Sequence, residues 1–393
     1  MSARAYRLRS LDLVRGLVIV IMALDHVRDY VHSGAAQDPT SDPTVGLALF
    51  FTRWITHFCA PVFVFLAGTS AGLMAARKMP GEVGGFLLKR GLWLFAVEWF
   101  VIATAFSFAP WGIEQLQGLV FTPIQVLGAI GVSMVVLSGA QWLGRSACLW
   151  LGVVVLAGHN LLDPVWPTSN PFDTSQPLWV ALHAQMGLVV GPFMVVIVYP
   201  MLAWVGVMLF GFGCAGIFER EPEDRTRQLL RWGGIMAVAF VALRATQLYG
   251  DPNPWMAQGS VASTVMDFLN VTKYPPSLLF LMMTLGPMAI LCASADRLRG
   301  TVSDVLVAYG RAPFAFYVAH FYLIHVLSVA LGTAQGFAPR QFMTFMAFFP
   351  QGYGLPLAGV YAVWAFVVVS LYPLVRWVGA LKARRTDWWL SYL

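Results

Sequence analysis

Long apolar stretches recur along the whole chain and alternate with short segments rich in basic residues, proline and tryptophan. Most stretches approach or exceed the roughly 20 residues that a helix needs to cross a bilayer. Because a spanning segment must satisfy its backbone polar groups internally, the pattern predicts helices. We expect about ten, at residues 11–31, 48–75, 84–107, 118–139, 147–162, 189–217, 229–249, 276–295, 306–332 and 356–379.

The composition agrees with this pattern. Hydrophobic residues make up 58% of the 393 residues and charged residues only 11%, which excludes an ordinary soluble domain. The sequence therefore predicts an all-α, polytopic integral membrane protein that forms one transmembrane domain over residues 1–393. The net charge of +6 follows the predicted loops and does not indicate nucleic-acid binding.

The basic residues predict the orientation of these helices. With a cytoplasmic N-terminus, twenty of the 25 Lys and Arg residues fall in inner segments. The five in the outer half are Arg28, Arg53, Arg244, Lys273 and Arg340. The positive-inside rule thus favours an even number of crossings with both termini in the cytoplasm.

The first helix carries two polar residues on one stripe. Arg15 and His26 are eleven residues apart, almost three helical turns, and lie about 16 Å apart along the axis. An ionised group at membrane depth costs roughly 3 kcal/mol or more, so polar residues in spans usually serve a function.

Further polar residues reach the outer ends of four predicted helices. In chain order they are Asp25, His26, Arg28, Asp29, Arg53, His57, Asn270, Lys273, Tyr274, Tyr317, His320 and His325. Such a layer needs a water-filled cavity or a ligand to be tolerated in a membrane. The sequence therefore predicts a polar site at this depth.

The residue types in this layer suit acid–base chemistry. We expect His26 or His57 to act as a general base, with Asp25 or Asp29 orienting it. Asn270 or Lys273 would stabilise an oxyanion. Arg53, Tyr274, Tyr317 and His320 are candidate substrate-binding residues. A metal held by His26, His57 and an aspartate lacks the tight ligand spacing typical of such sites, so we expect no metal.

A second polar group lies at the inner boundary. It comprises Arg15, Lys89, Arg90 and Arg311. These residues fit ordinary positive-inside topology with contacts to lipid phosphates. They also fit an anion site for a phosphorylated cofactor, and the sequence leaves both interpretations open.

Several motifs resemble one family. The start of the first helix, Arg7-Leu8-Arg9-Ser10-Leu11-Asp12-x-x-Arg15-Gly16, resembles that of heparan-α-glucosaminide N-acetyltransferase-like membrane proteins. The Arg15-x10-His26 spacing resembles the signature of the broader acyltransferase type 3 superfamily. The bacterial branch of the group is similar at Thr52 to Gly68, at Thr272-Lys273-Tyr274-Pro275-Pro276-Ser277-Leu278 and at Gly310-Arg311-x-Pro313-x3-Tyr317-x2-His320.

The resemblance implies transfer of an acetyl group from cytoplasmic acetyl-CoA to a hydroxyl or amine of an extracytoplasmic acceptor, as in the sugar N-acetyltransferases. The essential Arg and His of the type 3 enzymes would correspond to Arg15 and His26. Animal members carry a catalytic histidine followed by an asparagine in the loop after the first helix. Residues 32–47 contain His32 but no asparagine, so His26 and His57 remain the two candidates.

Two other classes of membrane protein are alternatives to an acetyltransferase. A proton-coupled permease would use the polar layer as a substrate path, but we find no inverted repeat typical of transporters. A structural or lipid-organising protein would leave the layer unexplained. We expect acetyl-CoA, a carbohydrate acceptor and the lipid bilayer as partners, a bacterial inner-membrane location, and an oligomeric state for which a homodimer is one option.

Overall fold

The computed structural model describes residues 8–34, 38–40, 45–165, 177–385 and 387–392, and this part of the chain is mostly helical. The long helices are α1 (Arg9–Val31), α3 (Cys59–Ala75), α4 (Pro80–Val97), α6 (Val126–Ala140), α7 (Gly144–Gly158), α9 (Met201–Gly213), α11 (Pro222–Thr246), α13 (Leu278–Ala295), α14 (Thr301–Arg311), α15 (Pro313–Ala334) and α16 (Leu357–Arg384). The shorter ones are α2 (Leu47–Trp54), α5 (Ala103–Ser107), α8 (Pro177–His183), α10 (Ala215–Phe218) and α12 (Val261–Leu269).

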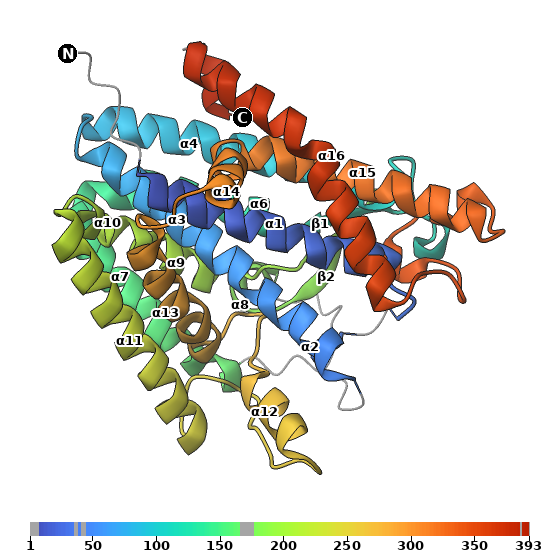
Figure 1. Cartoon of the computed structure of the whole chain (residues 1–393), viewed down its shortest axis with the longest axis horizontal. Coiled ribbons are helices and arrows are strands. Elements are labelled where there is room, and N and C mark those ends of the chain that lie inside the picture. The colour runs from blue at the N-terminus through green and yellow to red at the C-terminus, as the bar shows by residue number, and fades with distance from the viewer. Residues whose placement is uncertain (1–7, 35–37, 41–44, 166–176, 386, 393) are drawn as a thin grey trace.

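Helix α1 is the centre of the molecule (Figure 1). It packs against α3, α13, α14, α15 and α16, and most of its residues are buried. The pairs α4–α6, α7–α9, α3–α9 and α11–α13 form the rest of the bundle. Helices α11 and α16 expose most of their apolar surface, as expected for helices that face lipid.

Seven helical runs of the described residues are long and apolar enough to cross a membrane. They are Leu47–Ala75, Val126–Pro164, Met201–Phe218, Pro222–Thr246, Leu278–Ala295, Pro313–Ala334 and Leu357–Arg384. Helix α1 is not among them and carries Asp12, Arg15, Asp25 and Arg28 along its length. These runs support the polytopic membrane class, while the number of crossings and the side of each terminus stay predictions.

A small β-sheet departs from the all-α prediction. Strand β3 (Phe193–Ile197) pairs in parallel with β1 (Val120–Ile124) and antiparallel with β2 (Met186–Val190). Predicted spans 118–139 and 189–217 were therefore wrong at their starts, because these short runs rich in β-branched residues form strands. Gly191, with a φ of 56°, makes the turn between β2 and β3.

One further predicted span is divided. The predicted helix 306–332 consists of α14 and α15, which meet at Ala312. Pro313 opens α15, where its missing amide hydrogen costs nothing because the first turn has no intrahelical acceptor. The break turns the chain so that α14 lies against the first half of α1.

Two glycines allow α1 and α14 to touch through their backbones. A Cβ atom on Gly16 would lie 1.8 Å from the Leu306 carbonyl oxygen, and one on Gly310 would lie 1.7 Å from the Asp12 carbonyl oxygen. Only glycine permits this approach. The crossing brings Arg311 next to Asp12, at 3.7 Å between Nε and Oδ2.

Candidate functional site

A cavity of about 430 Å³ lies at the C-terminal end of α1. This cavity is here called the polar chamber. Its polar wall is formed by Asp25, His26, Asp29, Arg53 and Lys273. The opposite wall is largely apolar and comes from the β-sheet and from residues 345–348. The structure thus brings together side chains from α1, α2 and the loop before α13, as the sequence predicts.

The contacts of His26 fix its protonation pattern. The Nδ1 atom of His320 faces the main-chain oxygens of Tyr317 (2.5 Å) and Phe316 (3.1 Å), so it carries a hydrogen and donates. The Nε2 atom of neutral His320 then accepts, and it lies 2.7 Å from Nδ1 of His26. His26 therefore donates through Nδ1 and keeps a lone pair on Nε2.

The two carboxylates beside His26 are paired with arginines. Arg53 donates to Asp25, and Arg28 donates to Asp25 at 3.3 Å and to Asp29 at 2.5 Å. Arg53 also lies 3.6 Å from Asp38, in the loop after α1. Burial would raise the pKa of Asp38, but Arg53 and the hydrogen bonds from Thr40 outweigh it and lower that pKa to about 2. The partner of His26 Nδ1 is thus His320, and Asp25 contacts arginines.

The loop that carries Lys273 is held by one arginine. Arg244 donates to the carbonyl oxygens of Phe268 (3.0 Å), Asn253 (2.7 Å) and Asn270 (2.7 Å). The Lys273 ammonium lies 5.2 Å from the ring centre of Tyr274, and both side chains line the chamber. Asn270 enters this arrangement through its carbonyl oxygen and does not line the chamber.

Two other candidate histidines lie apart from the chamber wall. His57 is 2% exposed, and its ring centre lies 5.5 Å from that of Phe280 on α13. Its Nδ1 atom has no hydrogen-bond partner among the described residues. His32 accepts a hydrogen bond from the amide of Gly34 at 3.0 Å.

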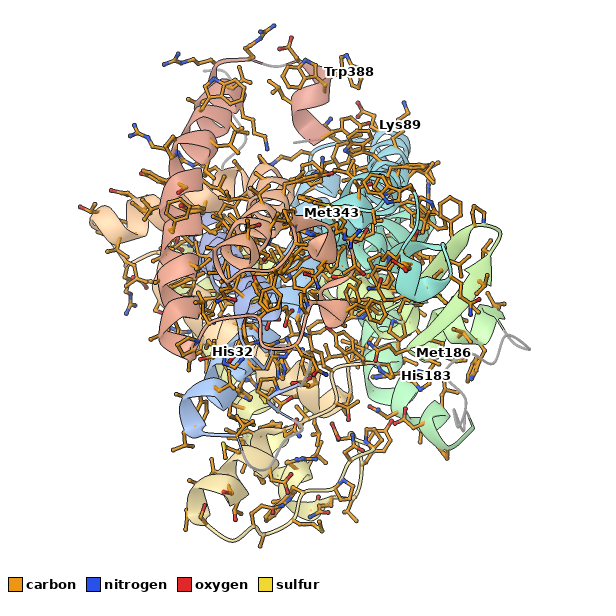
Figure 2. The ribbon with its side chains drawn as sticks, turned by 90° about the vertical axis from the view of Figure 1, so that its right-hand side faces the viewer. His32, Lys89, His183, Met186, Met343 and Trp388 are labelled. Atoms are coloured by element: carbon orange, nitrogen blue, oxygen red, sulfur yellow. The ribbon has the colours of Figure 1, made fainter. Side chains whose placement is uncertain are left out.

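A second cavity, of about 790 Å³, lies at the N-terminal end of α1. This cavity is here called the basic mouth. Its basic residues are Arg15, Arg77, Lys78, Arg311 and Lys382. Arg15 is held by Asp12 at 3.2 Å and by Ser70 at 3.3 Å. Arg15 and Arg311 are brought together as the sequence predicts. Lys89 is exposed on the outside of α4 and does not reach the mouth (Figure 2).

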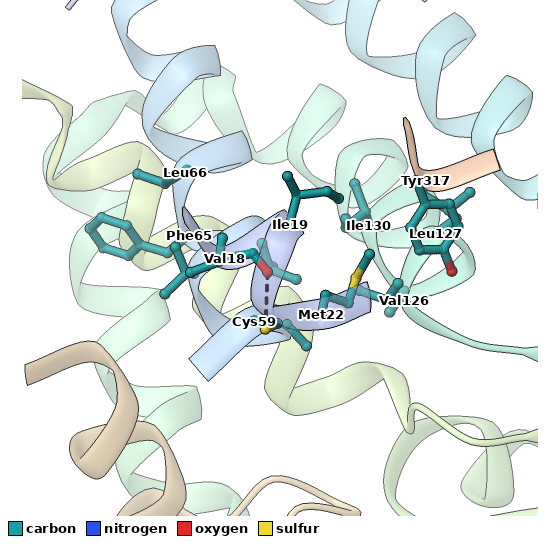
Figure 3. Close-up of a cluster of buried hydrophobic side chains, with 14 of the residues drawn as sticks. Val18, Ile19, Met22, Cys59, Phe65, Leu66, Val126, Leu127, Ile130 and Tyr317 are labelled. Carbon is teal, nitrogen blue, oxygen red and sulfur yellow. Dashed lines mark hydrogen bonds between the residues drawn. The ribbon is translucent and has the colours of Figure 1, made fainter. Parts of the chain in front are cut away.

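A narrow cavity of about 140 Å³ continues from the mouth along α1. This apolar passage is lined by Ile19, Met22, Val126, Leu127, Ile130 and Tyr317, among others (Figure 3). Arg15 and Arg90 also line it, and Arg15 is shared with the basic mouth. Met22 precedes His26 by one helical turn, so the passage runs from the basic mouth toward the polar chamber.

Glu98 holds the helix that forms the other side of the passage. The π-helical turn Glu98–Ile102 turns its carboxylate toward α6, where it accepts from the amide of Gly128 at 2.7 Å. A carboxylate at a helix N-terminus is favourable because the first amides have no intrahelical partner. Within the described residues, no group of three or more His, Cys, Asp or Glu side chains could hold a metal ion.

Sequence reasoning missed several residues of these cavities. The orienting contact of His320 was not foreseen, because it depends on how α15 is rotated against α1. Arg77, Lys78 and Lys382 resembled ordinary topology signals, and only the fold places them around one cavity. Gln125 lines the chamber from within the predicted helix 118–139, and Gln185 lines it from a predicted loop.

Comparison with known protein families identifies one family for this chain. Residues 7–249 match the family model described as heparan-alpha-glucosaminide N-acetyltransferase, catalytic. The match spans more than half of the chain and includes Arg15, His26 and Arg53, and it ends before Lys273 and His320. A comparison with curated proteins gives no match. The chain is therefore an integral membrane protein of the heparan-α-glucosaminide N-acetyltransferase family, whose activity is acetyl transfer.

Proposed function

We propose that this protein moves an acetyl group from acetyl-CoA in the basic mouth to a hydroxyl or amine in the polar chamber. The observation that carries the proposal is the alignment of three cavities along α1. The mouth and the passage share Arg15, and the passage ends one helical turn before His26. We infer that the passage leads on to the chamber, which would connect an arginine site and a histidine site about 16 Å apart.

The basic mouth has the charge that coenzyme A requires. Arginine and lysine side chains converge there, and they bind phosphate groups through charge-assisted hydrogen bonds. The passage is narrow and mostly apolar, which suits the thin pantetheine arm that follows the phosphates. In this arrangement the thioester would reach the chamber while the nucleotide stays in the mouth.

His26 is the proposed general base. Its Nε2 lone pair takes the proton of the acceptor, which attacks the acetyl carbon. His320 accepts from Nδ1 and keeps the ring in the productive tautomer. The Lys273 ammonium lines the same cavity and would stabilise the oxyanion. The same lone pair could instead attack the acetyl carbon directly, giving an acetyl-histidine intermediate.

The chamber suits a carbohydrate acceptor. It combines the charged side chains of Asp29 and Arg53 with the apolar side chains of Phe121 and Phe345. Polar groups at a few points with apolar walls between them are typical of small-molecule sites. We propose a sugar or glycan on the extracytoplasmic side, with the basic mouth in the cytoplasm and the protein in a bacterial inner membrane.

The test uses purified protein in detergent and radiolabelled acetyl-CoA. We expect release of free CoA that depends on an added amino sugar or sugar alcohol, with the label in the acceptor. Labelled enzyme in the absence of acceptor would identify the acetyl-histidine route. Uptake of an intact solute into protein-containing vesicles, with no CoA release under any condition, would contradict the proposal and favour a permease.

A further inference from the structure

The hydroxyl of Tyr317 is a buried polar group without a partner. The side chain is 4% exposed, and its oxygen forms no hydrogen bond with any described residue. Burying a hydroxyl without a partner is unfavourable, so such groups in native proteins call for an explanation. Tyr317 lines the apolar passage, and a molecule in the passage would supply the missing partner.

Tyr317 lines the passage and lies near His26, which lines the polar chamber, so we call its position the junction of the two cavities. Its ring centre is 6.4 Å from that of His26 and 5.5 Å from that of His320. On the other side, it stands with Leu127 and Val126 of α6 around the passage (Figure 3). The reacting end of a donor that threads the passage must come to this junction, because His26 lies just beyond it.

The passage offers few other polar groups. Among its described lining residues, the remaining side chains with a hydrogen-bond donor are Arg15 and Arg90. Arg15 is seven residues before Met22, about 10 Å along the axis of α1, and it belongs to the basic mouth. A thiolate formed at the junction would be an anion in largely apolar surroundings, which is costly unless it is protonated. Among the described lining residues of the passage, Tyr317 has the only uncharged side chain with a hydrogen-bond donor.

We propose that Tyr317 is a catalytic residue that protonates the departing sulfur of coenzyme A. This inference rests on the proposed function. The acceptor gives its proton to His26 Nε2 and forms a bond to the acetyl carbon. The carbon–sulfur bond then breaks, its electron pair stays on sulfur, and the Tyr317 hydroxyl transfers its proton there. The products are the acetylated acceptor and the free thiol. After they leave, His26 loses its proton to water and the phenolate of Tyr317 takes one from water, which restores both groups.

Tyr317→Phe tests this role while keeping the ring that packs against Phe321. The matched control is Tyr322→Phe on the same helix, whose hydroxyl donates to the Val101 carbonyl at 2.9 Å and does not line the passage. With acetyl-CoA we expect kcat of Tyr317→Phe to fall about 100-fold with little change in KM, and the control to stay near wild type.

A second donor separates acid catalysis from packing. The acetyl thioester of an electron-poor arylthiol releases a thiolate that leaves readily without a proton. We expect the defect of Tyr317→Phe to shrink to a few-fold with this donor. The defect of His26→Gln should stay the same with both donors.

The outcomes distinguish this inference from the proposed function. Wild-type activity of Tyr317→Phe, an equal loss with both donors, or a rise in KM alone would overturn the assignment of Tyr317 while leaving acetyl transfer intact. A wild-type protein that never turns over acetyl-CoA would overturn the proposed function itself.

Discussion

At the scale of single residues, the site depends on a pair of histidines. Two main-chain oxygens accept the hydrogen on Nδ1 of His320, so its Nε2 atom must accept. That atom lies 2.7 Å from Nδ1 of His26, which therefore carries a hydrogen. In many enzymes a carboxylate orients the catalytic histidine. Here the neighbouring Asp25 is engaged by Arg53 and Arg28, and a neutral histidine takes the orienting position.

This arrangement predicts that His320 is a positioning residue. His320→Phe keeps the ring contact with Phe316 but removes the acceptor for His26 Nδ1. We expect kcat for acetyl transfer to fall about 10- to 100-fold with an unchanged KM for acetyl-CoA, since the tautomer of His26 is no longer selected. His320→Gln, whose side-chain oxygen can accept, should recover part of the activity. Equal losses for both variants would argue for a purely structural role.

Most of the chamber could be predicted at this scale, because charged residues are rare in apolar helices and each one is conspicuous. Which of His26 and His57 lines the chamber could not be predicted. The chain forms a 3₁₀ turn at Ile55–Phe58, which advances about 120° per residue where an α-helix advances about 100°. The turn changes the α-helical spacing between Arg53 and His57, and His57 packs against Phe280 on α13.

At the scale of elements, the contact between α1 and α14 builds the basic mouth. The two glycines at the crossing let Asp12 of α1 lie between Arg15 and Arg311, at 3.2 and 3.7 Å. Both arginines follow or precede a glycine directly in the sequence. The glycines thus determine how closely the cations of the two helices approach one another.

Gly16→Ala should therefore damage both stability and donor binding. The new Cβ would lie 1.8 Å from a carbonyl oxygen, so the helices must separate, at a cost of about 1–3 kcal/mol. We expect a lower thermal unfolding temperature in detergent and a higher KM for acetyl-CoA. Gly81→Ala on α4 is the control, because its Cβ meets open space and should leave both quantities near wild type. Equal behaviour of the two variants would contradict this account of the crossing.

The bounds of some elements could be predicted from the sequence pattern, and those of others could not. Helix α1 was predicted within two residues at its start and to the residue at its end, because its apolar run is long. The strands were missed because a short run such as Phe193–Ile197 is equally apolar in a buried helix and in a strand, and the pairing of β1 with β3 spans some seventy residues. A short stretch of sequence predicts neither this pairing nor the chamber wall that the sheet forms.

At the scale of the whole molecule, the proposed function requires that the cavities at the two ends of α1 be connected. The sequence predicted two polar layers at different depths, and the structure adds a cavity at each layer and a narrow one along α1 between them. The narrow passage lies between α1, α6 and α15, and no local pattern encodes how these helices are placed. The match of the family model to residues 7–249 covers α1 and α6 and ends before α15.

Blocking the passage should abolish acetyl transfer and leave CoA binding in the basic mouth intact. Ile130→Trp places a large ring in a cavity of about 140 Å³ without changing any charged residue. We expect acetyl transfer to be lost, because the thioester cannot reach His26, while CoA still binds the mouth in a calorimetric titration. Val136→Trp on the exposed face of the same helix should keep its activity. Full activity of Ile130→Trp would mean that the donor takes another route.

The most direct test of the account is the turnover of acetyl-CoA by His26→Gln and His57→Gln, measured side by side with the same acceptor. We predict that His26→Gln loses at least about 100-fold in kcat, because the lone pair that takes the acceptor proton is gone. His57→Gln should retain most of the activity, because His57 does not line the chamber. Wild-type turnover by His26→Gln, or an equal loss in His57→Gln, would contradict it.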